Sequence, residues 1–206
     1  FVGSGFVVSN DDENGLKIIT NGHVVNDAAR LQVQIPSKGQ QKYDATTILL
    51  NPDWDVAIVT VKGETREKLL KDMGSDEIKV FDIAKSQVGA VSGLDVYAMG
   101  FPLGVTSLKV TTGIVSGSQV IGGFLSYQNT AQISPGNSGG PLFVAGTNHV
   151  VGINYASLEG EGAEQNNFAV PSFRVKQMMA ALDAQHDDAT ANNTVVGQYK
   201  KETDRK

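Results

Sequence analysis

The sequence predicts an all-β protein built from antiparallel strands. Short runs rich in β-branched and aromatic residues recur at close spacing, and glycine, asparagine and aspartate separate them. This pattern favours an antiparallel sandwich or barrel over alternating strands and helices. A chain of 206 residues is long enough for one large β domain or for two small barrels, each with a core.

Five strands are expected in the first half of the chain. The first two flank a hairpin turn at residues 10–15, where asparagine, aspartate and glycine gather. The five segments are Phe1–Ser9, Leu16–Thr20, Arg30–Ile35, Tyr43–Leu50 and Val56–Lys62. Residues 64–73 break the pattern, because Leu69, Leu70 and Met73 form an apolar patch and Gly74 supplies a helix-end signal. We interpret this segment as a surface helix.

The second half is expected to add six strands and a helix. Residues 85–93 are read as the connection between the halves, and the strands are predicted over 95–101, 108–121, 124–131, 142–145, 149–155 and 167–170. A helix is predicted from Ser172 to about Asp183, because Val175, Met178 and Leu182 share one face. Residues 187–206 are polar and mixed in charge, which is typical of a tail or linker.

Composition excludes several classes of function. The net charge of −5 arises from mixed acids and bases, so we expect no nucleic-acid partner. No apolar run is long enough to span a bilayer. The chain has no cysteine, so its stability does not depend on disulfides. We predict no cofactor and no metal site. The start at Phe1, without an initiator methionine or signal peptide, indicates a processed or trimmed piece of a longer protein.

One stretch carries most of the chemical information, and it runs from Gln132 to Leu142 as QISPGNSGGPL. It places Ser138 in a turn crowded by glycines, ahead of an apolar strand. A serine hydroxyl becomes a good nucleophile only where its surroundings activate it and stabilise the negative charge that its attack creates. Glycines let backbone N–H groups converge on one point, so Gly136 and Ser138 are candidates for an oxyanion hole. The alternative is a structural glycine-rich turn.

Two further segments offer a base and an acid. His23 lies at the end of a β-branched run, and a packed strand end would hold a general base rigidly. The alternative is an ordinary strand-end histidine, which is how we interpret His149. Asp55 directly precedes the apolar run Val56–Val61, where a carboxylate could orient a histidine. Asp53 competes for this role, but it follows a proline and is typical of a turn.

These blocks, taken in order, resemble the trypsin-like serine proteases and specifically their HtrA/Deg branch. The matching segments are GSGFVV at 3–8, TNGHVV at 20–25, DVAIV at 55–59, GNSGGPL at 136–142, and GIN at 152–154 with FAVPS at 168–172. A looser block is MGFPLG at 99–104, leading into VTTGIVS at 110–116. The resemblance covers roughly residues 1 to 180. It implies His23 as general base, Asp55 as its orienting acid and Ser138 as nucleophile.

The resemblance also implies a fold. Two six-stranded antiparallel β-barrels with a C-terminal helix would divide the chain into residues 1–85, 86–186 and a tail at 187–206. The GSG strand is usually the second of the first barrel, and almost nothing precedes it here. The first strand is therefore expected to be trimmed, absent or replaced. The β-prone segment Thr194–Tyr199 is our candidate for covering the open edge.

Specificity is predicted from the same resemblance. Ile153, Asn154 and Tyr155 would pair with the substrate backbone as an added strand. Gln132 would lie at the base of the pocket for the residue before the cleaved bond, with Ile133 and Phe168 as apolar walls. Cleavage after arginine or lysine needs a carboxylate at the base, so that preference is rejected.

The predicted function is a serine endopeptidase that acts on unfolded or flexible polypeptides. Asn137 stands where zymogen-activated relatives carry an aspartate, so activation by a freshly cut N-terminus is not expected. The alternative is a resting or inert binding or scaffold protein on the same fold. An esterase is disfavoured because the chain lacks a Gly-x-Ser-x-Gly elbow between a strand and a helix. A homotrimer, a role in protein quality control and a periplasmic, secreted or organellar location are expectations from the resemblance alone.

Overall fold

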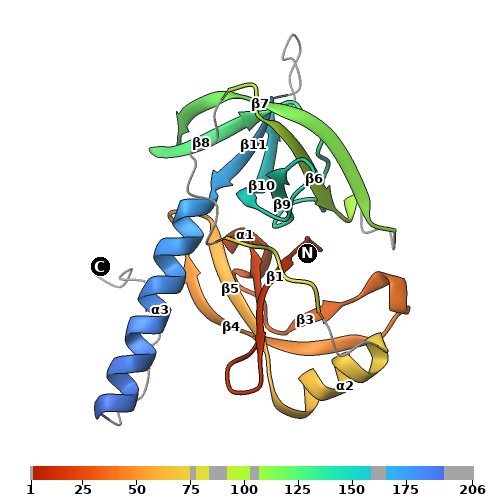
Figure 1. Cartoon of the computed structure of the whole chain (residues 1–206), viewed down its shortest axis with the longest axis vertical. Coiled ribbons are helices and arrows are strands. Elements are labelled where there is room, and N and C mark those ends of the chain that lie inside the picture. Colours follow the sequence, from red (N-terminus) through yellow and green to blue (C-terminus); the bar gives the residue numbers. More distant parts are fainter. Residues whose placement is uncertain (1, 75–77, 84–91, 103–106, 159–165, 193–206) are drawn as a thin grey trace.

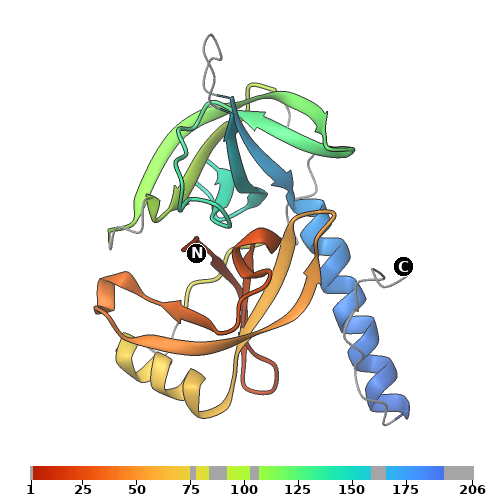
Figure 2. The same cartoon turned by 180° about the vertical axis from the view of Figure 1, so that it is seen from behind.

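The structure is a computed structural model, and it describes residues 2–74, 78–83, 92–102, 107–158 and 166–192. It consists of two antiparallel β units, and a long C-terminal helix runs from one unit along the side of the other (Figure 1). The N-terminal end of the described chain lies between the two units when the molecule is seen from the front or from behind (Figure 2).

The first unit is a five-stranded sheet with the order β1-β2-β5-β4-β3. Its strands are β1 (Phe6–Asp11), β2 (Gly15–Thr20), β3 (Leu31–Gln34), β4 (Lys42–Asn51) and β5 (Val56–Val61). The central strand β5 is buried along its whole length because both of its faces meet a core. Val56 and Ile58 face the cluster shared with the second unit, whereas Ala57 and Val59 face a cluster within the first unit.

The expected six-stranded closed barrel is wrong for this first unit. Among the described residues, β1 and β3 are the two edges of an open sheet and no strand joins them. The GSG segment leads directly into β1, so the strand that would pair with both edges is not supplied by the described chain. Residues 194–199, the predicted cover for this edge, lie outside the described residues.

The second unit is a closed six-stranded barrel with the order β10-β11-β8-β7-β6-β9, as expected. Its strands are β6 (Asp95–Gly100), β7 (Lys109–Ile121), β8 (Phe124–Asn129), β9 (Pro141–Val144), β10 (Val150–Leu158) and β11 (Asn166–Pro171). Gly122 and Gly123 both have positive φ, which makes the tight turn between β7 and β8. The barrel interior holds small and branched apolar side chains such as Val96, Val115 and Leu142.

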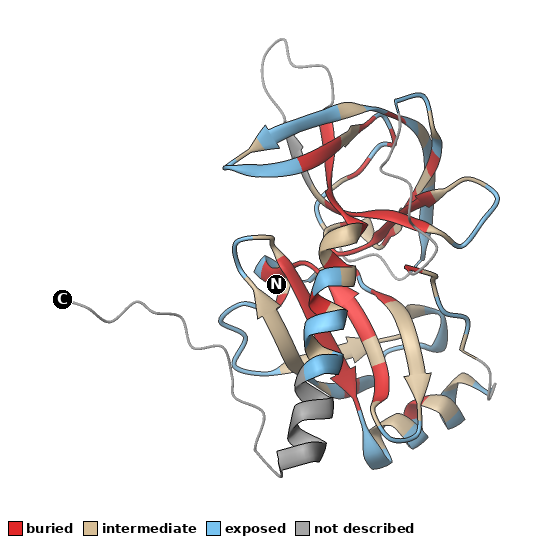
Figure 3. Ribbon diagram, turned by 60° about the vertical axis from the view of Figure 1, so that its left-hand side comes forward, coloured by how far each residue is buried: buried red, intermediate tan, exposed pale blue. Residues whose placement is uncertain are grey.

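A shared hydrophobic cluster joins the two units. It combines Phe6 and Ile19 of the sheet with Phe143 and Ile153 of the barrel. Phe81 lies between them, with its ring centroid 5.6 Å from that of Phe6 and 5.3 Å from that of Phe143. Buried residues continue from the strands into the region where the units meet (Figure 3). The relative position of the two units is therefore set by packed side chains.

Three α-helices and a short 3₁₀ helix, η1 (Pro36–Lys38), complete the described chain. The one-turn helix α1 spans Gly22–Val25, and α2 spans Gly63–Met73 and ends at Gly74, whose φ of 66° is left-handed. The C-terminal helix α3 runs from Ser172 to Asn192, further than the predicted end near Asp183. The added turns are rich in alanine, a strong helix former, and contain neither glycine nor proline. The predicted division at residues 85 and 86 stays a prediction, since 84–91 lie outside the described residues.

Candidate active site

His23 is held by a short helix rather than by a strand end. Strand β2 stops at Thr20, and His23 lies one turn further on in α1. Between them, Asn21 is fully buried and its Nδ2 donates to the Asp55 carbonyl oxygen at 2.9 Å. This bond links the segment before His23 to the backbone of Asp55 independently of the His23 and Asp55 side chains.

Asp55 holds His23 through both carboxylate oxygens. Its Oδ2 lies 2.8 Å from Nδ1 of His23, and its Oδ1 accepts the His23 backbone N–H at 2.8 Å. Asp55 follows the turn after β4, where Asn51 Oδ1 accepts the Trp54 N–H at 2.9 Å. The structure therefore brings Asp55 to the histidine. This is the arrangement that the sequence predicted in preference to Asp53.

The pairing changes the protonation behaviour of His23. The hydrogen bond to Asp55 is the largest influence on the pKa of His23 and raises it above 6.5, the charge of Asp55 adds to this, and partial burial opposes both. Because Nδ1 donates to the carboxylate, the neutral ring presents Nε2 as its proton acceptor. His23 therefore has the electronic arrangement of an oriented general base.

The Ser138 turn is shaped by close contacts. Gly136 has a φ of 99°, and the Asn137 N–H donates to the Ser134 carbonyl at 2.9 Å. At Gly139 the φ is 89°, and a side-chain carbon would collide with the Ser4 carbonyl oxygen and the Thr20 hydroxyl. Glycine at 139 is therefore required by proximity to the first unit as well as by conformation.

The Ser138 hydroxyl is not hydrogen-bonded to His23 in the part of the chain that the structure describes. It donates instead to the carbonyl oxygen of Tyr155 at 3.2 Å. Tyr155 lies at a register shift in β10, between the pairs Asn154–Ala169 and Ala156–Phe168. Such a bulge redirects a residue next to a site. His23 and Asp55 are thus in direct contact, whereas the Ser138 hydroxyl makes a different hydrogen bond, within the second unit.

The residues predicted to pair with substrate differ in their accessibility. Ile153 and Asn154 are fully buried, and the side chain of Asn154 donates to the carbonyls of Gly140 and Pro141 at 3.2 and 3.1 Å. Tyr155 is half-buried, and its hydroxyl lies 3.0 Å from the Ser126 hydroxyl. Burial raises the pKa of Tyr155 most, the hydrogen bond with Ser126 opposes this, and the charge of Asp55 adds to the rise. Of the three, Tyr155 has the position from which a side chain can meet a ligand.

The predicted specificity pocket is more dispersed than the sequence indicated. Gln132 is exposed, and its carbonyl accepts from the Thr111 hydroxyl at 2.7 Å. Ile133 is buried among the barrel-interior side chains, and Phe168 is fully buried with its ring centroid 6.4 Å from that of Tyr155. These three side chains occupy different environments, and their role in specificity stays a prediction.

A small cavity of about 180 Å³ lies beside Asp55 and is lined in part by the predicted residue Tyr155. Its walls also include Trp54, Phe124 and Arg174, which the sequence did not indicate. The guanidinium of Arg174 lies 4.5 Å from the centroid of the Trp54 ring. Arg174 lies in the first turn of α3, far along the chain from Trp54, so no local sequence signal could have paired them.

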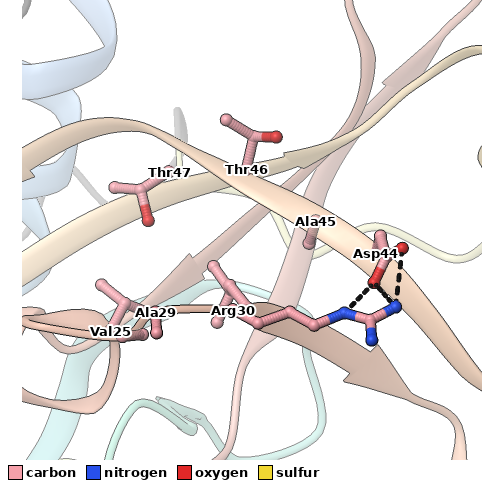
Figure 4. Close-up of a pocket in the computed structure, with 9 residues that line it drawn as sticks. Val25, Ala29, Arg30, Asp44, Ala45, Thr46 and Thr47 are labelled. Atoms are coloured by element: carbon pink, nitrogen blue, oxygen red, sulfur yellow. Dashed lines mark hydrogen bonds and ion pairs between the residues drawn. The ribbon is translucent and has the colours of Figure 1, made fainter.

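A larger cavity of about 430 Å³ lies on the first unit between residues 25–31 and strand β4. Figure 4 shows Arg30 and Asp44 on one side of it, with their charged groups paired. Hydrogen bonds from Gln32 and Arg30 lower the pKa of Asp44. None of the predicted site residues lines this cavity.

Within the described residues, no cluster of three or more His, Cys, Asp or Glu side chains could hold a metal ion. No described helix combines the length and apolar character needed to cross a membrane.

Comparison with known proteins assigns this chain to a family. The profile of a trypsin-like peptidase domain matches residues 3–153, most of the chain, so the protein belongs to the trypsin-like peptidases. Its relatives place it within the HtrA/DegP family. A probable periplasmic serine endoprotease DegP-like of Chlamydia pneumoniae is 35% identical over 186 residues, which are 87% of this chain and 34% of that protein. Serine protease HTRA1 of Xenopus laevis is 34% identical over 205 residues, 96% of this chain and 39% of that protein.

Solved structures agree on the fold. The serine endoprotease from Yersinia pestis superposes with a TM-score of 0.66 at 28% identity, covering 87% of this chain and 57% of that one. The HtrA-type protease AlgW with decapeptide gives a TM-score of 0.67 at 24% identity, with 87% and 52% covered, and supports the fold alone. The chain spans about a third of the length of the two curated relatives described.

Proposed function

We propose that this chain is a serine endopeptidase in which Ser138 is the nucleophile, His23 the general base and Asp55 its orienting acid. The observation that carries the proposal is the two-point hold of Asp55 on His23, through Nδ1 and through the backbone N–H, each at 2.8 Å. A purely structural histidine would not need its ring and its backbone fixed by one carboxylate. Membership of the HtrA/DegP family supports the same roles.

The chemistry follows from these roles. Nε2 of His23 removes the proton from the Ser138 hydroxyl as its oxygen attacks a peptide carbonyl carbon, and Asp55 stabilises the imidazolium that forms. The protonated ring then gives its proton to the leaving amine, which breaks the peptide bond and leaves an ester on Ser138. Water repeats the sequence against that ester, with His23 again as base, and releases the acid and the free serine.

The negative oxygen of each tetrahedral intermediate needs donors close by. The backbone N–H groups of Gly136 and Ser138 are the candidates, and the positive φ of Gly136 supports this assignment because it turns the chain sharply just ahead of the serine. Losing one such donor costs a serine protease on the order of 10² to 10³ in rate.

Unfolded or flexible polypeptides are the proposed substrates. Relatives of this chain are described as serine endoproteases, although the chain matches only about a third of their length. Gln132 supplies no carboxylate for a basic residue before the cleaved bond, so cleavage after arginine or lysine is not expected. Assembly as a homotrimer rests on the family alone, and sedimentation velocity would test it.

A resting or inert binding protein is the second candidate, and one observation favours it. The Ser138 hydroxyl donates to Tyr155 rather than to His23, so proton transfer to the base cannot begin from this arrangement. If this were the only state in solution, the site would bind peptides without cleaving them.

Casein digestion by the native chain and by Ser138→Ala separates the two candidates. We expect new peptides from the native chain, none from Ser138→Ala or His23→Ala, and normal digestion by the control His149→Ala. Mass spectrometry of the products gives the cleavage preference. No cleavage by the native chain, together with no labelling by a fluorophosphonate probe, would favour the inert protein.

A further inference from the structure

Ser4, which leads into the first unit, is in direct contact with the Ser138 turn. It precedes β1 and is only 5% exposed. Its backbone N–H donates to the carbonyl of Ser138 at 2.7 Å, and its own carbonyl accepts from the Thr20 hydroxyl at 2.7 Å. Both the N–H and the carbonyl of Ser4 are therefore hydrogen-bonded, and the N–H bonds to the backbone of Ser138, the proposed nucleophile.

The Ser4 hydroxyl makes two more bonds across the same boundary. It donates to the Gly136 carbonyl oxygen at 2.6 Å and accepts the Phe101 N–H at 2.9 Å. A hydroxyl has one proton to donate, and here that proton is assigned to Gly136. Gly136 is 132 residues away in the sequence, so this bond reflects the docking of the two units rather than local structure.

The bonded carbonyl belongs to the peptide that joins Gly136 to Asn137. The other end of that peptide, the Asn137 N–H, donates to the Ser134 carbonyl at 2.9 Å. A peptide is planar, so anchoring its oxygen and its N–H fixes the orientation of the whole plane. This plane lies in the chain between the N–H of Gly136 and the N–H of Ser138, the two donors proposed for the oxyanion hole.

Tight packing around Ser4 supports this role. A side-chain carbon at Gly100 would lie 2.8 Å from Oδ1 of Asn137 and 2.9 Å from Oγ of Ser4. Glycine at 100 and at 139 thus leaves room for Ser4 to reach the turn. Residues of the first unit, β6 and the Ser138 turn converge on one buried hydroxyl.

We propose that Ser4 is a positioning residue for the oxyanion hole: its hydroxyl holds the Gly136–Asn137 peptide, and thereby aims the Gly136 and Ser138 N–H groups at the reacting oxygen. The inference rests on the proposed function, because it assigns those groups to the oxyanion. Ser4 acts through the turn and is not itself in contact with the substrate.

The test compares Ser4→Ala with Ser9→Ala. Ser9 lies on β1, and its buried hydroxyl has no hydrogen-bond partner among the described residues, so this control loses the same atom without losing a described bond. With a chromogenic peptide ester, Ser4→Ala should lower kcat on the order of 10²-fold and change KM less than twofold, because a small misplacement weakens transition-state contacts more than ground-state binding. Ser9→Ala should match the native chain. A native kcat in Ser4→Ala would overturn the proposal.

Hydrogen–deuterium exchange provides a readout that does not depend on activity. The peptide covering residues 132–140 should exchange faster in Ser4→Ala than in Ser9→Ala, because the Gly136–Asn137 peptide loses one of its two anchors. Equal exchange in the two variants would overturn the positioning role even if the native chain cleaves nothing. A native chain that is not labelled by a fluorophosphonate probe would instead count against the proposed function.

Discussion

Asp55 occupies a backbone conformation that few side chains adopt. Its φ of 53° lies in the left-handed region, which costs a residue other than glycine about 1–2 kcal/mol and which aspartate tolerates better than most. In this conformation both carboxylate oxygens face His23, at its ring and at its backbone. Local strain at one residue is thus associated with the geometry that the proposed chemistry requires.

Replacing Asp55 by asparagine tests this arrangement through pH. The hydrogen bond and charge of Asp55 raise the pKa of His23 above 6.5, so the native kcat/KM should rise with pH through that raised pKa as the ring loses its proton. Asp55→Asn should move this rise to lower pH and reduce the rate about 10⁴-fold, because the amide no longer holds the required tautomer. Steady-state rates from pH 5 to 9 measure both effects. An unchanged profile would exclude Asp55 as the partner of the base.

The same pairing has a consequence for stability. A raised pKa in the folded state means that the protonated His23–Asp55 pair stabilises the native protein fully below pH 6.5, and that this contribution is lost as pH rises through the raised pKa. Urea unfolding of the native chain and Asp55→Asn at pH 5.5 and pH 8.5 measures it. The difference in unfolding free energy between the two proteins should be larger at pH 5.5.

At the level of single residues, the sequence indicated features carried by short segments and missed hydrogen bonds between distant segments. His23, Asp55 and Ser138 could be proposed from the sequence because each lies in a short segment whose pattern is itself informative. Ser4 was part of a matched block, but its hydroxyl partner in Gly136 could not be read from that block. The Ser138–Tyr155 bond depends on a bulge, and no residue pattern in β10 indicates a bulge there.

Among the elements, α3 has the clearest structural role. Met178 is buried and packs in the cluster that joins the two units, whereas the neighbouring Met179 is half-buried at its margin. The helical spacing of apolar residues predicted this face correctly. The spacing did not predict where the helix ends, because the polar residues after Asp183 are compatible with both helix and coil. The absence of glycine and proline from these residues is the one feature that favours helix over coil.

Met178→Ala should lower the free energy of unfolding by about 2–5 kcal/mol, since it removes a buried side chain and leaves a cavity. Met179→Ala is the matched control and should cost clearly less, because its side chain keeps contact with solvent. Chemical denaturation with global fits of both variants gives the two values. Equal costs would mean that α3 does not dock through the face described.

A short segment at Phe81 and Asp82 makes backbone hydrogen bonds to both units. Phe81 donates its N–H to Val7 of β1 at 2.9 Å, and Asp82 donates to Asn148 at 3.0 Å. The carbonyl of Asp82 in turn accepts from Val150 of β10 at 3.3 Å. The open sheet and the closed barrel are therefore linked by hydrogen bonds as well as by aromatic packing. The sequence placed a connection near here but did not predict these contacts.

Phe81→Ala should weaken the coupling between the units. The native chain should unfold in one calorimetric transition, with equal calorimetric and van't Hoff enthalpies, because the shared cluster is lost as a whole. Without the Phe81 ring, the sheet and the barrel should unfold in two separable transitions. Phe124→Ala, at the exposed tip of the β7–β8 hairpin, is the control and should keep a single transition. A single transition in Phe81→Ala would place the coupling elsewhere in the cluster.

Trp54 is the only tryptophan of the chain, and it lies next to Asp55 with Arg174 against its ring. An indole stacked on a guanidinium changes its emission when either partner moves. The native chain therefore contains an intrinsic fluorescent reporter at the edge of the proposed site. Peptide binding, a shift of the α3 N-terminus or a rearrangement of the aspartate turn can each be followed by intensity and wavelength, without attaching a dye and without any bond being cleaved.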